Sequence, residues 1–325
     1  MSFALLATTA YALVVKQQNR SQIAGAARVL RLAHSLDTKH PVHLGMVRMA
    51  EVVEELSDGK LKLDITPNGT LGSETQCLEM LQHGVLDMAK TSSAPLEGFV
   101  PEVAVFGVPY VFRDEAHCWR VLDGPIGKRL LAAGADKGIV GLCYYDAGAR
   151  SFYTVSKPIV TPSDLEGLKI RVQSSNMAIQ MVKALGGAAT PLEWGELYTA
   201  LHASMLDGAE NNLPSFYTSR HFEVCRYFSF DEHTRVPDML LISTITWQTL
   251  SDTQRGWLQQ ASAESVLLQR QLWREETERV AADLEAAGVQ FTRPDQALFR
   301  EKVQPLHESL AGTVVGDLMK EIDQE

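Results

Sequence analysis

The chain has 325 residues, a length that suggests about two domains. Hydrophobic residues make up 45% of it and charged residues 22%, an ordinary globular composition that argues against disorder, a collagen-like repeat or a disulfide scaffold. The formal net charge of −10 argues against a nucleic-acid-binding protein. We therefore expect a two-domain globular protein that has no nucleic-acid partner.

The N-terminal segment differs from the rest of the chain. No acidic residue precedes Asp37, and residues 3–15 form the longest apolar run. As a helix this run would rise about 20 Å, which is short of the roughly 30 Å hydrocarbon core of a membrane. Its length suits a secretory signal peptide, and residues 24–26 offer a small-residue cleavage site, although no basic residue precedes the run. We expect residues 1–28 to be a signal peptide or an N-terminal anchor of an exported protein.

Strands and helices alternate in the following part of the chain. Residues 29–33 predict a strand, the stretch from Pro41 to Gly59 has helical apolar spacing, and residues 60–65 alternate like a half-exposed strand. Strand, helix and strand over this length indicate a βαβ unit with parallel strands. Further along we expect a helix at 73–84, strands at 86–90, 139–145, 151–155 and 168–172, and helices at 176–185 and 193–203. This alternation predicts an α/β fold with sheets covered on both faces.

The C-terminal part has a different composition. Residues 251–287 contain no proline, and only Gly256 interrupts their helix-forming sequence. A continuous helix of this length would reach roughly 50 Å, which exceeds the diameter of one domain. Such a helix could brace two lobes. Two shorter helices that meet near Gly256 or further along are the alternative.

The sequence offers no known catalytic or metal-binding motif. It lacks G-x-G-x-x-G, the P-loop, G-x-S-x-G and H-E-x-x-H. His40 and His43 could share a helix face, but no third ligand is near them, so we expect neither a metal site nor a cofactor. The four cysteines are far apart and are expected to be unpaired, half-buried thiols: Cys77, Cys118, Cys143 and Cys225.

Two arginines are candidates for an anion site. Arg171 lies inside the predicted strand at 168–172, and Arg150 ends a glycine-containing turn just before the strand at 151–155. A buried guanidinium needs an anion, and its planar fork suits a carboxylate. An internal salt bridge or an exposed edge position is the alternative for each arginine.

A third polar feature follows. Residues 207–212, Asp-Gly-Ala-Glu-Asn-Asn, read as a turn rich in carboxyl and amide groups between two helical stretches. Side chains of this kind can cap a helix or bind a polar ligand by hydrogen bonds.

Together these segments resemble the solute-binding proteins of tripartite ATP-independent periplasmic (TRAP) transporters, the DctP-like family. The resemblance runs from Leu30 to about residue 310. It rests on segments in the family's order and spacing at 71–74, 84–88, 164–172, 191–201 and 206–212. Each segment is weak alone, and the order makes the set specific.

The resemblance implies a two-lobed clam-shell of the periplasmic-binding-protein type, with the long helix bridging both lobes. Lobe I would comprise residues 29–150 and about 235–270. Lobe II would comprise residues 151–234 and about 271–325. The chain would therefore cross between the lobes near residues 150 and 235.

The resemblance also assigns roles to individual residues. Arg171 would pair with the ligand carboxylate, Arg150 would add to the anion site, and Asn211 would hold the same carboxylate. Glu74 would contact polar groups of the ligand from the other lobe. Other side chains at predicted strand or helix ends could bind ligand hydroxyl groups or serve as caps: His34, Lys90, Ser92, Ser93 and Asn212.

Segments near residues 148–153, 194–198 and 231–234 look like those of members that bind sugar acids, notably uronates such as glucuronate or galacturonate. The resemblance implies a monomeric periplasmic protein that captures a carboxylate-bearing solute by lobe closure and delivers it to a TRAP permease in the membrane, without catalysis. A C4-dicarboxylate or a keto acid is the alternative ligand. The alternative functions are the binding subunit of a sensor, and an enzyme in which Arg171 clamps a carboxylate substrate and His34 or His233 acts as the base.

Overall fold

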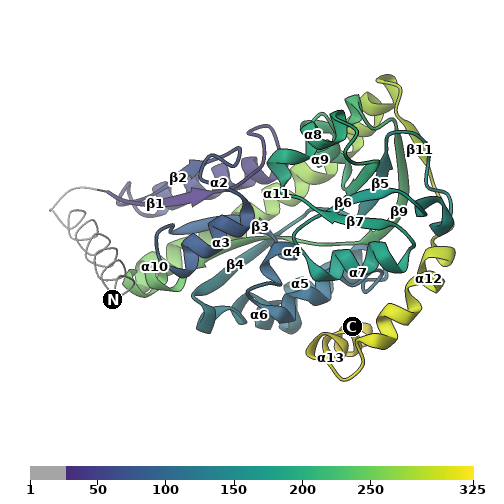
Figure 1. The fold of residues 1–325 in the computed structure, drawn as a ribbon. Helices are drawn as coiled ribbons and strands as arrows, with labels where there is room; N and C mark the ends of the chain where they lie inside the picture. Colours follow the sequence, from purple (N-terminus) through teal and green to yellow (C-terminus); the bar gives the residue numbers. More distant parts are fainter. Residues whose placement is uncertain (1–26) are drawn as a thin grey trace, which may run out of the picture.

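A computed structural model describes residues 27–325, and the predicted signal peptide or anchor lies outside these residues except for its last two positions. Figure 1 shows two sheets side by side, with one long helix running along both. We call the first sheet with its helices lobe I and the second sheet with its helices lobe II. None of the helices within residues 27–325 is long and apolar enough to span a bilayer.

The strands form two mixed sheets. Lobe I has five strands in the order β2-β1-β3-β10-β4: β1 (Arg28–Ala33), β2 (Leu61–Thr66), β3 (Met88–Ser92), β4 (Ile139–Tyr145) and β10 (Asp238–Ser243). Lobe II has six in the order β11-β9-β5-β8-β6-β7: β5 (Arg150–Thr154), β6 (Lys169–Val172), β7 (Ala188–Pro191), β8 (Gly208–Asn211), β9 (Tyr227–Thr234) and β11 (Gln290–Thr292).

Helices follow most strands. Those connected to the lobe I sheet are α2 (Pro41–Leu56), α3 (Glu74–Gln82), α4 (Ser93–Leu96), η1 (Pro101–Gly107), α5 (Glu115–Asp123), α6 (Pro125–Ala132), η2 (Ala135–Lys137) and α10 (Thr244–Thr249). Those connected to the lobe II sheet are η3 (Pro162–Leu165), α7 (Asn176–Ala184), α8 (Trp194–His202), α9 (Leu213–Thr218) and η4 (His221–Glu223). The C-terminal helices are α11 (Asp252–Ala286), α12 (Gln296–Ser309) and α13 (Val314–Asp323).

The predicted βαβ unit is present at the start of lobe I. β1 and β2 pair in parallel, with Leu30 opposite Leu63. Between them, α2 buries Met46, Met49 and Val53, which recur on one helix face, in the core of the lobe. The predicted α/β fold is thus confirmed at the start of the described chain.

The predicted long helix is continuous. α11 begins with a capping box in which the Ser251 side chain accepts from the Gln254 backbone. Its N-terminal half packs Leu258 in the core of lobe I, and its C-terminal half packs Leu284 in the core of lobe II. Gly256 leaves the helix unbroken. α11 therefore bridges the two lobes, as expected, and the alternative of two shorter helices is wrong.

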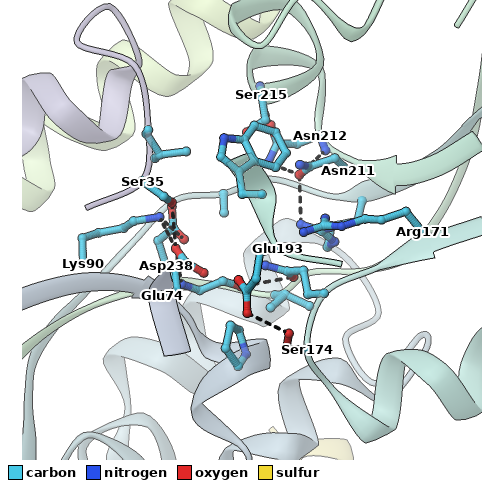
Figure 2. Close-up of a pocket in the computed structure, with 18 residues that line it drawn as sticks. Ser35, Glu74, Lys90, Arg171, Ser174, Glu193, Asn211, Asn212, Ser215 and Asp238 are labelled. Carbon is cyan, nitrogen blue, oxygen red and sulfur yellow. Dashed lines mark hydrogen bonds and ion pairs between the residues drawn. The ribbon is translucent and has the colours of Figure 1, made fainter. Parts of the chain in front are cut away.

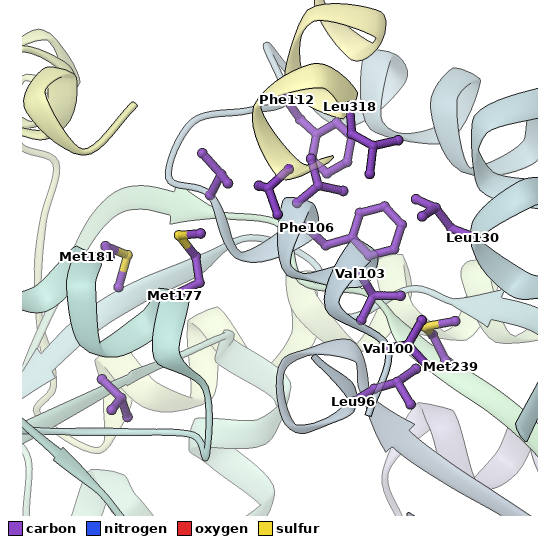
Figure 3. Packing of buried hydrophobic residues seen from close by; sticks show 14 of the residues in the cluster. Leu96, Val100, Val103, Phe106, Phe112, Leu130, Met177, Met181, Met239 and Leu318 are labelled. Atoms are coloured by element: carbon purple, nitrogen blue, oxygen red, sulfur yellow. The ribbon is translucent and has the colours of Figure 1, made fainter. Parts of the chain in front are cut away.

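The last helix departs from the expected division of the chain. Residues 271–325 were assigned to lobe II, and α12 does contact α7 and β9 there. α13, however, packs on η1, and Figure 3 shows Leu318 beside Phe112 and Phe106. The physical reason is that α13 is strongly amphipathic, and the apolar surface that covers its buried face belongs to η1 and the residues just after it, which lie between β3 and β4 of lobe I.

Two further expectations are corrected. Residues 207–212 were predicted to form a turn, but Gly208–Asn211 is β8, a buried strand with β5 on one side and β6 on the other. Its polar side chains are satisfied by neighbouring strands, which hydrophobic patterning cannot detect. The four cysteines are free, as expected, but they are buried and not half-buried.

Candidate functional site

A polar pocket lies between the two lobes (Figure 2). Most of the side chains predicted to bind ligand line it: Arg171, Arg150, Asn211, Glu74, Asn212, Lys90 and Ser92. His34 and Ser93 are not among the lining residues. The structure therefore gathers most of the predicted residues in one place, although they come from distant parts of the sequence.

Sheet topology explains how the lobe II residues meet. β6 and β8 are parallel, so Arg171 and Asn211 both lie toward the carboxyl ends of their strands. β5 runs antiparallel to β8 with Ser151 opposite Asn211, which brings Arg150, at the start of β5, to the same edge. Ligand sites in open α/β sheets commonly lie outside the carboxyl ends of parallel strands.

Arg171 is a buried cation without an acidic partner in residues 27–325. Its side chain is on the lobe II side of the pocket, and the residue is 3% exposed (Figure 2). Nε donates to the Leu192 carbonyl over 2.8 Å, Nη1 has no hydrogen-bond partner, and no described carboxylate forms an ion pair with the guanidinium. Burial lowers its pKa. The arrangement calls for an anion in the pocket.

Arg150, in contrast, is already paired. Its Nη2 lies 2.9 Å from Oε1 of Glu210, and the ion pair holds the pKa of Glu210 down at about 2 although burial opposes this. The alternative of an internal salt bridge therefore applies to Arg150. Its Nη1 donates to Oδ1 of Asn211 over 2.9 Å. Because Oδ1 is an acceptor there, the Asn211 amide nitrogen is left as a donor for another group.

His233 lies behind this pair. Its Nδ1 is 2.7 Å from Asp231 Oδ2, and Nε2 is 3.4 Å from Glu210 Oε2. Although burial alone would lower the pKa of His233, the two carboxylates raise it to about 9. His233 does not line the pocket. It is a protonated support for Glu210 and is badly placed to act as a base on a ligand.

His34 is also held away from the pocket. Its Nδ1 accepts from the Leu36 backbone over 3.1 Å, and its Nε2 is 2.9 Å from His43 Nδ1. Burial, with Lys90 nearby, lowers the pKa of His34 to about 2. His40 instead contacts Ser215 in the other lobe over 3.2 Å. Within residues 27–325, no three His, Cys, Asp or Glu side chains are grouped to hold a metal ion.

The lobe I wall is built around a buried ammonium group. Lys90 Nζ lies 3.1 Å from Oε1 of Glu74 and 3.0 Å from Oδ1 of Asp238. Glu74 also accepts from the Ser92 backbone over 3.2 Å and from the Ser35 hydroxyl over 3.4 Å. Figure 2 shows this cluster facing Arg171 across the pocket. The wall therefore presents carboxylate and hydroxyl oxygens to whatever lies between the lobes.

Several lining residues were not predicted: Ser35, Gln173, Ser174, Glu193, Ser215 and Asp238. Asp238 had an indirect signal, because a buried lysine such as Lys90 requires an acidic partner, but nothing in the sequence says which one. The role of Glu193 is visible only in the structure. It is the N-cap of α8 yet makes no side-chain cap, and it accepts instead from Thr75 at 3.2 Å and Ser174 at 3.1 Å.

Comparisons with known proteins agree with this geometry. The family described as bacterial extracellular solute-binding protein, family 7, matches residues 32–313. A TRAP periplasmic solute-binding protein of Bradyrhizobium sp. BTAi1, solved with α/β-D-galacturonate, is 41% identical with a TM-score of 0.89, covering 92% of this chain and 100% of that one. One from Chromohalobacter salexigens DSM 3043, solved with D-glucuronate, is 32% identical with a TM-score of 0.88, covering 91% and 99%.

A curated relative adds a different solute. The 2,3-diketo-L-gulonate-binding periplasmic protein YiaO of Escherichia coli K12 is 30% identical over 277 residues, which are 85% of this chain and 84% of that protein. Two of these proteins were solved with a uronate, and the third is named for 2,3-diketo-L-gulonate.

Proposed function

Because the chain belongs to the bacterial extracellular solute-binding proteins of family 7, the DctP family, we propose that it binds a uronate, D-galacturonate or D-glucuronate, in the pocket between its lobes. As a member of this family it is a periplasmic solute-binding protein of the TRAP type, which works with a membrane permease. The uronates are the solutes of the similar structures from Bradyrhizobium and Chromohalobacter.

The unpaired Arg171 guanidinium is the observation that carries this proposal. A ligand carboxylate between Arg171 and the Asn211 amide nitrogen would give the buried charge its missing partner. A hydrogen bond to a charged group contributes about 1.5–3 kcal/mol. Arg150 then acts by orienting Asn211, since its own charge is matched by Glu210.

The opposite wall suits the rest of a sugar acid. Ring hydroxyl groups need acceptors as well as donors, and Glu74 and Asp238 supply carboxylate oxygens there. Trp194 lies with its ring 5.9 Å from the Arg171 guanidinium and also lines the pocket. It supplies an apolar surface for one face of the sugar ring, as aromatic side chains can.

Capture would work through lobe closure. The ligand bridges groups of both lobes and stabilises the closed arrangement over the open one, which the permease then recognises. We propose no catalytic step, because the two candidate bases, His34 and His233, do not line the pocket.

A ligand screen tests the proposal. Purified protein is titrated calorimetrically with galacturonate, glucuronate, 2,3-diketogulonate and succinate. We expect a uronate to bind most tightly, and Arg171→Gln to weaken it by about 10-fold or more through loss of the charge-assisted bond. Lys183→Gln, which removes an exposed cation on α7, is the matched control and should bind as wild type does. Tighter binding of succinate or the diketo acid would refute the uronate assignment.

A further inference from the structure

We infer that the pocket binds a ligand with one carboxylate and excludes a ligand with two. The wall facing Arg171 therefore selects monocarboxylates whose other groups are neutral hydroxyls. The inference rests on the proposed function and deepens it. It assigns this selectivity to Glu74, Asp238 and Glu193. These carboxylates repel the second carboxylate of a doubly charged acid, and they accept hydrogen bonds from ligand hydroxyl groups.

The first step is that only one pocket cation is available to a ligand. Of the three basic side chains that line the pocket, Arg150 is paired with Glu210, and Lys90 is paired with both Glu74 and Asp238. Only Arg171 lacks a carboxylate partner among the described residues, and its Nη1 has no partner of any kind. One ligand carboxylate is therefore enough to neutralise the unpaired positive charge of Arg171.

The second step concerns the opposite wall. Lys90 is its only lining cation, and three lining carboxylates lie on or near this wall: Glu74, Asp238 and Glu193. Glu193 comes from lobe II but bonds with Thr75 of lobe I over 3.2 Å, so it is directed across the cleft (Figure 2). Its other partner is the Ser174 hydroxyl, and no described cation pairs with it. A second ligand carboxylate would meet an excess of negative charge.

The third step is chemical complementarity. A hydroxyl group can donate a hydrogen bond to a carboxylate, whereas an ionised carboxylate has no proton to donate. The same oxygens that hold a sugar hydroxyl therefore repel a carboxylate placed at that point. Discrimination of this kind depends on the cost imposed on the wrong ligand as much as on the bonds made to the right one.

The experiment separates charge from shape. Binding is measured by calorimetry for galacturonate and for two open-chain acids on the same carbon skeleton, galactonate with one carboxylate and galactarate with two. Because the two open-chain acids differ in charge and little in shape, their comparison isolates the second carboxylate. We expect galactonate to bind about 100-fold more tightly than galactarate, since like charges at close range oppose binding strongly.

Two isosteric variants locate the effect. Glu193→Gln and Glu74→Gln each remove one negative charge from the wall, and each should reduce the galactonate-to-galactarate ratio of affinities about 10-fold. Glu74→Gln also leaves Lys90 with only Asp238, which frees part of the ammonium charge for the ligand. Glu196→Gln, an exposed change on α8, should leave the ratio as in wild type.

The outcomes are distinct. Equal affinities for galactonate and galactarate, or a ratio that neither variant changes, would overturn the inference and leave uronate binding standing if galacturonate binds. Tight galactarate binding without galacturonate binding would overturn both the inference and the proposed function.

Discussion

The Thr75 hydroxyl donates a hydrogen bond to Oε1 of Glu193 over 3.2 Å, and this bond joins lobe I to lobe II directly. Thr75 lies in the first turn of α3, and Glu193 is the N-cap residue of α8. Glu193 makes no cap with its side chain, so the carboxylate is free to reach the other lobe. The contact exists only while the lobes are close together, and it therefore stabilises the closed arrangement.

Thr75→Val should weaken ligand binding about 2- to 12-fold, because a lost hydrogen bond costs the closed form about 0.5–1.5 kcal/mol and costs the open form nothing. The dissociation constant for the uronate is measured by calorimetry. Thr253→Val, at an exposed position of α11, is the control for the same chemical change. An unaltered dissociation constant would show that this bond does not contribute to closure.

The stabilising effect of His233 should depend on pH. Its folded-state pKa is raised to about 9 from an ordinary 6.5, so protonated His233 stabilises the fold fully below about pH 6.5 and loses this effect as pH rises through 9. The free energy of unfolding of wild type minus that of His233→Gln should thus shrink by about 3 kcal/mol between pH 6 and pH 10. Denaturant unfolding at several pH values measures it, and a difference independent of pH would contradict the expectation.

Gly148 lies between β4 and β5, where the chain passes from lobe I to lobe II, with φ of +59°. A Cβ there would lie 3.0 Å from Nε1 of Trp273 on α11. Gly148→Ala should therefore lower the free energy of unfolding by about 1–2 kcal/mol, because alanine is strained in the left-handed backbone conformation. Displacing the Trp273 indole should lower it further. Gly167→Ala is the matched control, because its φ is +78° and nothing lies within 4 Å. The free energy of unfolding of each variant is measured in urea. Equal decreases for the two variants would show that Trp273 moves aside without an energetic cost.

The cysteines should be unreactive in the native protein. All four are buried and unpaired, and burial raises the pKa of Cys77 to about 11 and that of Cys143 to about 12. Since the thiolate is the reactive form, a thiol reagent at pH 8 should label native protein slowly. The same reagent in guanidinium chloride should label four thiols per chain quickly. Fast labelling of one thiol in native protein would identify a cysteine that local opening exposes.

Much of the fold follows from local patterns. The apolar spacing of α2, the alternation of β2 and the proline-free run of α11 are signals within single segments, and all three elements form as predicted. The order of the matched segments predicted the TRAP family, which the match over residues 32–313 confirms. The strand β8 was missed because its sequence, Gly-Ala-Glu-Asn, has no apolar alternation.

The candidate site was predictable only in part, since most of the expected residues line the pocket but several other lining residues were not expected. Strand ends that lie at one sheet edge bring Arg171, Arg150 and Asn211 together, and motif order was enough to expect this. His34 directly follows β1 of lobe I, yet its ring accepts a hydrogen bond from the Leu36 backbone and does not line the pocket. The rotation of a single side chain depends on neighbours that no local pattern describes.

The alternation of elements, the bridging helix and the family can all be predicted from the residues alone, because periodicity and motif order are properties of short segments of chain. Which charges are matched depends on the folded arrangement of those segments. Arg150 meets Glu210 across two paired strands, and Lys90 meets Asp238 from 148 positions away, whereas Arg171 pairs with no carboxylate within residues 27–325. Ion pairing depends on distance in space, which the fold sets, and it is this unequal pairing that leaves a place for the ligand's charge.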